Sequence, residues 1–382
     1  MNEVNRMEFR YYLPVNMIFG RGKLAEIGKV TAKHGSHALI VTGGSSTKKS
    51  GVLDRVRNSL LSERIESVVF DKVRPNPLTE TVELGAAFVR ENRCDVIVAV
   101  GGGSVIDCAK GIAFIAKNGR DINDYIYNRY QGRGALPLIA VPTTCGTGSE
   151  GNGFAVLTNP ETGDKKSLRR DGIIPAVSLI DSELMETMPK SILAVVGFDA
   201  LCHCMEAYLS NASQPMTDML SLEGMKLISD NLVNVYNGYN DPAAWDALAW
   251  ASTMGGMVIH SAGVGLPHAM EHPVSGFNNV THGRGLAALV PVITEASADY
   301  APEKYGVISK LLRGKTAADC ADAVRSYLEK LDLKVSLSGE GVTRKDIPKL
   351  TENCFKVSAA SIANHPAAFT SDMIAKLYER AL

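Results

Sequence analysis

Two short stretches of the sequence carry acidic and imidazole side chains at spacings that could bind a metal ion. Asp199 and His203 lie four residues apart, so both would point to the same side of a helix. His268 and His272 repeat this spacing, and His282 follows in a turn rich in glycine and asparagine. One carboxylate and three neutral imidazoles would leave a divalent metal ion with positive charge and open positions. Such a centre could act as a Lewis acid on a substrate oxygen.

Each histidine taken singly has a plainer interpretation, as a surface side chain or as a core side chain with satisfied hydrogen bonds. However, four of the eight histidines fall within the 23 residues from His260 to His282. This clustering, together with the Asp199/His203 pair, favours a metal site. Mixed nitrogen and oxygen ligation suits Fe(II) or Zn(II), and the ligand types do not separate the two metals.

The first half of the chain, to about residue 182, alternates short β-branched runs with helical stretches. The predicted strands are Ala38–Thr42, Ser67–Phe70, Asp95–Val100 and Leu138–Val141, and the predicted helices between them are 53–62, 79–92 and 104–117. Strands separated by helices imply right-handed crossovers and a parallel sheet covered on both faces. Ligands bind at the carboxyl ends of the strands in such sheets. This half therefore reads as a Rossmann-like dinucleotide-binding domain.

Glycine-rich turns follow the predicted strands and could bind the phosphates of a nucleotide. Gly101, Gly102 and Gly103 lead into a helix for which Ser104 would be the N-cap, and free N–H groups at a helix start attract a pyrophosphate. A plain strand-to-helix turn is the alternative interpretation. Thr143, Thr144 and Thr147 offer hydroxyls at the end of the next strand, either for the cofactor or merely to cap a turn.

The end of the first predicted strand bears on the choice of cofactor. A carboxylate at this place would bind an adenosine ribose and repel a 2′-phosphate, but the residue is Gly43. Gly44, Ser45 and Lys48 follow in a loop rich in hydrogen-bond donors, which suits a phosphate. The sequence therefore favours NADP(H) over NAD(H), although a solvated polar loop would look the same.

The second half of the chain is predicted to be all helical. Its long amphipathic stretches are 194–209, 215–233, 243–260, 318–331, 345–357 and 371–381. The segment from Asp181 to Pro189 indicates a domain boundary. It divides the chain into an α/β domain at 1–185 and a helical, metal-binding domain at 186–382.

The overall composition argues against several classes of partner. With 40 basic and 41 acidic residues the net charge is −1, so neither nucleic acid nor an anionic membrane is expected as a partner. The segment Met1–Tyr12 lacks the apolar run of a signal peptide, and the longest apolar stretches are strand-sized, so no membrane span is expected. Seven scattered cysteines fit reduced thiols in the cytoplasm.

Five patterns in this order resemble the iron-containing alcohol dehydrogenase family over essentially the whole chain. They are Phe19-Gly20-x-Gly22, Pro75-Asn76-Pro77, the loop from Gly101 to Lys110 that includes Asp107, the run Pro142–Glu150, and the Asp199/His203 and His268/His272/His282 set. The resemblance implies a dehydroquinate synthase-like fold and hydride transfer between a nicotinamide cofactor and a small alcohol or aldehyde. It makes Asp199, His203, His268 and His282 the ligands of Fe(II), with Zn(II) as the other candidate.

The resemblance also implies that His272 is not a ligand but a proton relay or positioning group near the substrate. Together with the loops above, it gives the cofactor-binding set Gly43, Gly44, Ser45, Lys48, Gly101, Gly102, Gly103, Ser104, Asp107, Thr143, Thr144 and Thr147. The chain departs from the family at Val196, where many members have threonine, and at Gly151–Phe154, where many have Val-Thr. The second departure lies at the expected substrate cleft, puts the substrate in doubt and looks more like the butanol-dehydrogenase branch.

Other interpretations remain open at this stage. A related glycerol-dehydrogenase or dehydroquinate-synthase enzyme would share the architecture but have fewer histidines in its metal site. A non-catalytic nucleotide-binding protein would not need the intact ligand set. The apolar segment Phe9–Ile18 could form an edge strand, and the family often dimerises through such edges, so a homodimer is expected.

Overall fold

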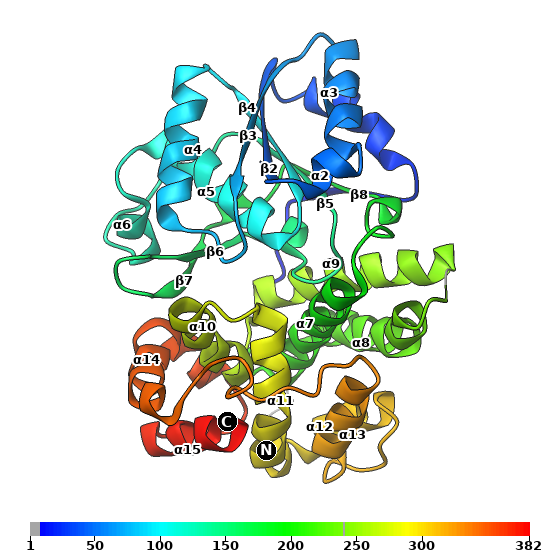
Figure 1. The fold of residues 1–382 in the computed structure, drawn as a ribbon, viewed down its shortest axis with the longest axis vertical. Coiled ribbons are helices and arrows are strands. Elements are labelled where there is room, and N and C mark those ends of the chain that lie inside the picture. Colours follow the sequence, from blue (N-terminus) through cyan, green and yellow to red (C-terminus); the bar gives the residue numbers. More distant parts are fainter. Residues whose placement is uncertain (1–7, 240) are drawn as a thin grey trace.

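Six parallel strands form the sheet of the first half of the chain. The computed structural model describes residues 8–239 and 241–382, and in Figure 1 this sheet and its helices lie above a purely helical half. The strands are β1 (Asn16–Phe19), β2 (His37–Gly43), β3 (Glu66–Val73), β4 (Val96–Gly101), β5 (Leu138–Pro142) and β8 (Val177–Ile180). Their spatial order is β1-β8-β5-β4-β2-β3, so β1 and β3 are the edges. The predicted α/β fold with a parallel sheet is confirmed.

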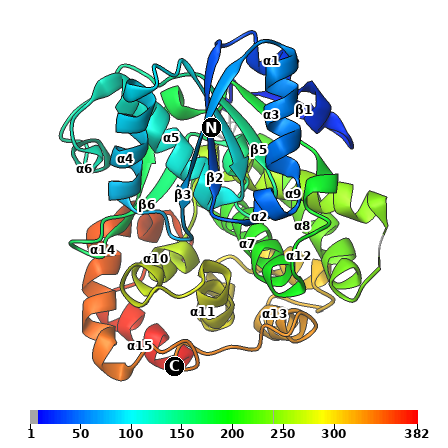
Figure 2. The same cartoon turned by 45° about the horizontal axis from the view of Figure 1, so that its top comes forward.

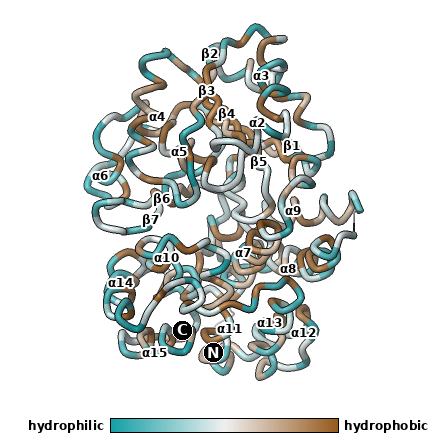
Figure 3. The backbone as a smooth tube through the Cα atoms, in the orientation of Figure 1, coloured by the Kyte–Doolittle hydropathy of each residue, from teal (hydrophilic) through white to brown (hydrophobic). Residues whose placement is uncertain are grey.

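Both faces of the sheet are buried because successive residues of each strand point to opposite sides. The helices of this half are α1 (Ile27–Thr31), α2 (Ser46–Lys49), α3 (Val52–Ser62), α4 (Thr79–Glu91), α5 (Gly103–Asn118) and α6 (Ile122–Ile126). On β2, Leu39 and Val41 pack with α4 and α5, whereas Ala38 and Ile40 pack with α1 and α3. Figure 2 shows the two helical layers on either side of the sheet, and Figure 3 shows hydrophobic residues concentrated in the strands.

A separate antiparallel hairpin joins the sheet half to the helical half. Its strands are β6 (Phe154–Thr158) and β7 (Lys165–Arg169), and Phe154 pairs directly with Arg169. Ala155, Leu157 and Leu168 bury one side of the hairpin against the core of the sheet half. The alternate residues, Phe154 and Val156 among them, therefore face the helical half, where β7 lies against α10 (Figure 1).

The second half contains only helices in the part of the chain that the structure describes. They are α7 (Lys190–Leu209), α8 (Pro215–Tyr236), α9 (Pro242–Ala262), α10 (Leu266–Asn278), α11 (His282–Ser297), α12 (Pro302–Leu311), α13 (Cys320–Glu329), α14 (Ile347–Asn364) and α15 (Ser371–Ala381). One core forms mainly around α7, α8 and α9, and a second around α10, α11, α14 and α15. The predicted all-helical second half is confirmed.

The helix α7 is apolar on nearly all sides because it runs through the centre of the first of these cores. By length and composition alone it could cross a membrane, but 89% of its most apolar window is buried inside the protein. The expectation that the longest apolar stretches are strand-sized was therefore wrong. This burial matters for the site, because Asp199 and His203 lie on this helix.

The sequence-based element boundaries differ from the structure in informative places. The expectation missed β6, β7, β8 and helices α11 and α12, gave no bounds for the helix α10 that carries His268 and His272, and placed an edge strand at Phe9–Ile18, where only Asn16–Phe19 forms one. Ser104 is not the N-cap, because α5 already begins at Gly103 with Gly102 in the capping position. The expectation about the segment Met1–Tyr12 falls largely on residues outside the described ranges.

Candidate metal centre and cofactor cleft

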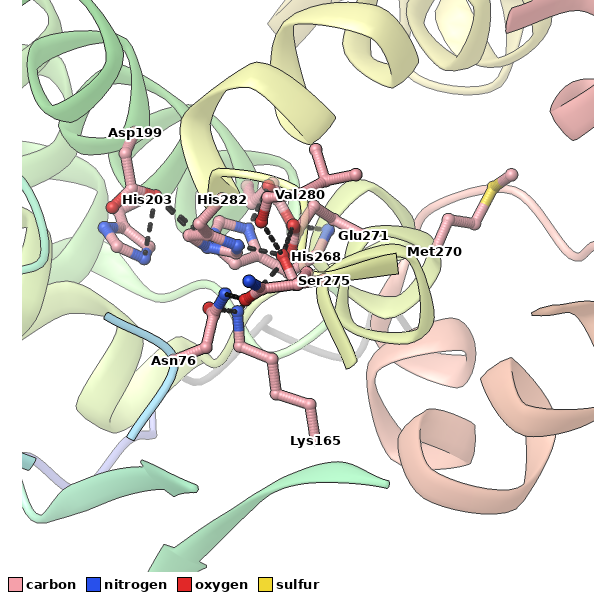
Figure 4. Close-up of polar contacts among 12 residues, drawn as sticks. Asn76, Lys165, Asp199, His203, His268, Met270, Glu271, Ser275, Val280 and His282 are labelled. Atoms are coloured by element: carbon pink, nitrogen blue, oxygen red, sulfur yellow. Dashed lines mark hydrogen bonds and ion pairs between the residues drawn. The ribbon is translucent and has the colours of Figure 1, made fainter. Parts of the chain in front are cut away.

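Three helices bring the four predicted metal ligands together. Asp199 and His203 lie one turn apart on α7, and His268 lies in the first turn of α10. His282 is the first residue of α11, with Thr281 in the N-cap position, so the prediction that it lies in a turn was wrong by one residue. Figure 4 shows the imidazoles of His203, His268 and His282 turned toward the carboxylate of Asp199.

The distances among these side chains fit a shared metal ion better than hydrogen bonds. The Nε2 atoms of His268, His282 and His203 lie 3.4, 3.6 and 3.7 Å from Oδ1 of Asp199. Oδ1 of Asp199 and Nε2 of His268 are buried and lack a hydrogen-bond partner among the described residues. Two atoms bound about 2.1 Å from one tetrahedral metal ion lie about 3.4 Å apart. The residues present therefore fit a divalent metal.

Two buried glutamates hold the ligand imidazoles from behind. Oε1 of Glu206 lies 2.6 Å from Nδ1 of His268, and its Oε2 accepts a 2.8 Å hydrogen bond from the backbone N–H of Gly265. Glu271 is hydrogen-bonded to Nδ1 of His282. Such carboxylates fix the ring orientation and raise the basicity of Nε2. Sequence reasoning missed both, although Glu206 lies three residues after His203 and Glu271 lies between two of the histidines.

The electrostatics keep Asp199 and His203 in the protonation states that metal binding requires. Burial alone would raise the pKa of Asp199, but interactions with His203, His282 and His268 outweigh it and lower that pKa. Burial lowers the pKa of His203 to about 4, despite the opposing charge of Asp199. At pH 7 the carboxyl group is therefore ionised and this imidazole is neutral, as ligands must be.

His272 lies beside the ligand cluster rather than within it. It lines a cavity of about 130 Å³ together with the four candidate ligands, and its ring centroid lies 5.9 Å from that of His282. Burial, followed by the charge of Lys165, lowers the pKa of His272, so its imidazole is neutral at pH 7. Glu271, His272 and His282 also have ligand atoms close together, a second grouping that could hold a metal. Glu271, however, is already bound to His282 and Ser275.

The glycine loop after β4 forms the opposite wall of the same cavity. Gly103, Ser104, Asp107 and Thr147 line it, as predicted for cofactor contacts. A Cβ atom at Gly103 would overlap the side chain of Thr147, so only glycine allows the loop and this threonine to approach so closely.

The remaining predicted cofactor groups of this loop lie beside the cavity. A Cβ atom at Gly102 would likewise crowd Thr144, and the N–H of Thr143 donates to the carbonyl of Gly101. Gly101, Gly102, Thr143 and Thr144 are not among the residues that line the cavity.

A buried ammonium group that sequence reasoning missed fixes the position of this wall. Lys110, fully buried on α5, donates to the carbonyls of Ser149 and Phe154, to Oγ of Ser149 and to Oδ1 of Asn152 at 2.7–3.0 Å. Burial lowers its pKa to about 8. Asp107 accepts hydrogen bonds from Ser149 and from the N–H of Val156, so its carboxylate already has partners within the chain.

The loop after β2 is only partly as predicted. Gly43 ends β2 and no carboxylate stands at this place, but Lys48 lies on the short helix α2 and its ammonium is 2.5 Å from Oδ2 of Asp71 on β3. The expected flexible donor loop is therefore a helical turn in which one cation is already paired. Gly44 and Ser45 connect the strand to this turn, with open space around Gly44.

One further cation reaches the cavity from the hairpin. Lys165 on β7 is 5% exposed, donates to Oδ1 of Asn76 at 3.1 Å and lies 3.8 Å from Oε2 of Glu271. Figure 4 shows its chain rising from β7 toward the metal ligands. Sequence reasoning missed it because a lysine in a polar hairpin carries no local signal.

Comparison with known proteins places the chain among nicotinamide-dependent oxidoreductases. Residues 14–182 match the family model "Iron-containing alcohol dehydrogenase", and residues 193–382 match its C-terminal counterpart. Alcohol dehydrogenase 4 of Schizosaccharomyces pombe is 32% identical over 97% of this chain and 89% of its own length. The NADPH-dependent butanol dehydrogenase of Clostridium saccharobutylicum is 30% identical over 97% of each chain, and the NAD-dependent methanol dehydrogenase of Bacillus methanolicus is 29% identical over 97% and 99%.

The likeness extends to solved structures. The archaeal halo-thermophilic Red Sea brine pool alcohol dehydrogenase ADH/D1 superposes with a TM-score of 0.93 at 33% identity, covering 99% of this chain and all of the other. Sequence and fold therefore match over the same full length.

Proposed function

The chain belongs to the iron-containing alcohol dehydrogenase family, and we propose that it interconverts a small primary alcohol and its aldehyde with NADP(H) in preference to NAD(H). It is an oxidoreductase that uses a nicotinamide cofactor, and the predicted family and enzyme class are confirmed. The observation that carries the proposal is the convergence of three imidazole Nε2 atoms on Oδ1 of Asp199, in a cavity whose opposite wall is the glycine loop.

The metal-binding residues in this proposal are Asp199, His203, His268 and His282. Iron is the metal that the family description names, Fe(II) suits these donors, and Zn(II) would accept the same donors. A divalent ion held there would polarise the oxygen of the substrate, while the cofactor exchanges a hydride with the substrate carbon. Glu206 and Glu271 keep His268 and His282 aimed at the centre, so the ligand geometry is set before any substrate enters.

We assign His272 to proton transfer or substrate positioning rather than to metal binding. Its neutral imidazole lines the cavity beside the ligands and can accept the hydroxyl proton of an alcohol, and in the reverse direction its imidazolium form can give that proton back to the substrate oxygen. Glu271, which would have to bind the metal together with His272 in the second possible site, is already hydrogen-bonded to His282.

The cofactor-binding residues in this proposal lie on the carboxyl edge of the sheet. Gly101, Gly102, Gly103 and Ser104 surround the start of α5, where backbone N–H groups suit a pyrophosphate. Asp107, Thr143, Thr144 and Thr147 complete this set. Gly43, Gly44, Ser45 and Lys48 would surround the 2′-phosphate of NADP(H), a preference supported by the absence of a carboxylate at Gly43. Named relatives use NADPH in one case and NAD in another.

We further propose a domain division, an oligomeric state and a cellular location for the chain. We divide it into a cofactor domain, 1–185, and a metal-binding domain, 186–382, because the last strand ends at Ile180 and α7 begins at Lys190. A homodimer through β1 is supported by the position of that strand at an edge of the sheet, where its outer backbone groups can pair. The seven buried free cysteines fit a reducing cytoplasm.

The test is a steady-state assay at 340 nm with short primary alcohols and aldehydes. The protein is stripped of metal with a chelator and then supplied with Fe(II) or Zn(II). We expect turnover of butanal with NADPH only after metal is restored. Absence of turnover with every alcohol and aldehyde, cofactor and metal combination in a protein that has bound one metal ion per chain would refute the proposal.

A further inference from the structure

Two further cavities beside the hairpin share lining residues with the cavity at the metal centre. His272 lines both the metal cavity and a cavity of about 230 Å³ next to α14. Phe154 lines both the metal cavity and a third cavity, of about 250 Å³, next to α9. Arg169 lines the second and third cavities. Arg169 therefore belongs to both of the cavities that adjoin the metal cavity at His272 and at Phe154.

The surroundings of Arg169 are positively charged. The second cavity is lined by Lys166, Arg169 and Arg170, with Ser167, Ser358 and Ser361 supplying hydroxyls. Neither this cavity nor the third has an aspartate or glutamate among its lining residues in the part of the chain that the structure describes. We call the residues Lys166, Ser167, Arg169, Arg170, Ser358 and Ser361 the basic annex.

The three cationic side chains of the basic annex differ in their hydrogen-bond partners. Lys166 donates to the carbonyl of Val357, and Arg170 donates to the carbonyl of Tyr125 and to Asn128. Within the described residues the guanidinium of Arg169 has no hydrogen bond or ion pair, and its Cζ lies 4.7 Å from the centroid of the Phe154 ring.

The hairpin holds the guanidinium of Arg169 in a defined position. Phe154 and Arg169 are directly paired across the hairpin, so the register of β6 and β7 fixes the stacking of the guanidinium on the ring. Arg169 is exposed to solvent, so an anion can reach its guanidinium, while neighbouring protein atoms lower its pKa through partial desolvation. A guanidinium stacked on one face keeps its edge N–H groups free, and those groups match the oxygens of a carboxylate, sulfonate or phosphonate.

We propose that the basic annex binds the anionic end of the substrate, with Arg169 as the residue that determines specificity. The substrate is then a short alcohol or aldehyde with a carboxylate, sulfonate or phosphonate at its far end. The functional oxygen lies at the metal centre, and the chain of the substrate passes His272 and Phe154. This inference rests on the proposed function, because it concerns the same cleft. The alternative source of the anion is a phosphate of the cofactor, and the test separates the two.

The experiment compares two aldehydes of equal length, 4-oxobutanoate and butanal, on the metal-loaded enzyme. We expect wild-type kcat/KM to be higher for 4-oxobutanoate. Arg169→Gln should lower kcat/KM for 4-oxobutanoate by about 10- to 100-fold, the range for losing one charge-assisted contact, and change that for butanal less than about twofold. The kcat/KM of Arg169→Lys for 4-oxobutanoate should lie between that of the wild-type protein and that of Arg169→Gln. Arg133→Gln, which removes an exposed arginine outside the cleft, is the matched control.

A binding measurement without turnover supports the kinetics. 4-Hydroxybutanoate should raise the Tm of the wild-type protein, whereas 1-butanol at equal concentration should not, and Arg169→Gln should abolish the difference. If Arg169→Gln does not fold, the comparison of the two ligands on the wild-type protein still decides.

Four outcomes overturn the inference: wild-type preference for butanal, an equal loss for both aldehydes, equal protection by both ligands, or a raised KM for the cofactor as the main effect of Arg169→Gln. The last would assign Arg169 to a cofactor phosphate. Turnover of butanal without preference for the anion overturns this inference alone and leaves the proposed function standing.

Discussion

The two sides of the cleft hold their functional groups in different ways. On the metal side, Asp199 and His268 are each 3% exposed, lie on long helices, and belong to a network in which Glu206 and Glu271 orient the imidazoles. At the loop proposed to bind the ribose, Gly43 and Lys48 lie at a strand end and on a one-turn helix, and the ion pair of Lys48 with Asp71 is open to solvent.

The difference follows from what each side must do. Metal chemistry requires ligand atoms fixed to within a fraction of an ångström, which buried helices provide. Recognition of a phosphate at the surface tolerates movement and is screened by water and salt. Substitutions should therefore have their largest effects on the metal side and their smallest at the ribose loop.

The largest effect is expected for His268→Ala, which removes one of the four proposed ligands. Metal binding at one ion per chain should be lost together with activity, because losing a protein ligand typically costs several kcal/mol of metal affinity. Elemental analysis and the assay at 340 nm measure both. The circular dichroism spectrum of the metal-free protein serves as the folding control. Wild-type metal content and turnover in this variant would contradict the ligand assignment.

His272→Ala should separate the proton-transfer role from metal binding. We expect the metal to remain bound while kcat falls on the order of 10²–10³-fold, as for removal of a positioned acid–base group. Metal content and kcat are measured on the same sample. Loss of the metal would instead favour the grouping of Glu271, His272 and His282 as the true site.

Glu206→Gln tests whether the carboxylates behind the ligands act as proposed. Glutamine keeps the shape and can still accept from Gly265, but it removes the negative charge 2.6 Å from Nδ1 of His268. We expect metal affinity to fall about 10- to 100-fold, measured by competition with a chelator. Glu91→Gln, an exposed glutamate far along the sequence on α4, is the control and should leave the affinity unchanged. An unchanged affinity in Glu206→Gln would make Glu206 a merely structural partner.

The same contrast explains how much the sequence could predict. The pairing of Asp199 with His203 and of His268 with His272 could be read from the sequence because helical spacing alone places each pair on one face, whereas the proposal that His282 is a ligand came from the family resemblance. The buried strands were predictable because both faces of a parallel sheet are apolar, so β2, β4 and β5 read as unbroken hydrophobic runs.

Features that depend on tertiary contacts were not predictable. Lys48 looked like a free phosphate ligand because no neighbouring residue in the sequence indicates its contact with Asp71, which lies 23 residues away on β3. Lys110 was named only as part of the family-like loop and given no role, because its four acceptors come from a loop about 40 residues further along the chain. The hairpin escaped notice because β7 (Lys165–Arg169) is polar and pairs only with β6.

The smallest effects are expected from two substitutions that change the charge of the ribose loop in opposite directions. Gly43→Asp adds a carboxylate at the end of β2, where a Cβ atom has room because its nearest neighbour would be 3.7 Å away. The ratio of kcat/KM for NADPH to that for NADH should fall about 10-fold, the effect of placing a charge against a phosphate at a partly exposed site. Asp71→Asn releases Lys48, since the hydrogen bond from Lys48 lowers the pKa of Asp71 and keeps it ionised at pH 7. This variant should raise the ratio about 2- to 5-fold, because an exposed ion pair contributes at most about 1 kcal/mol. Both effects should shrink as the salt concentration rises. A wild-type enzyme that prefers NADH, with a ratio that neither substitution moves, would show that this loop does not contact the 2′-phosphate.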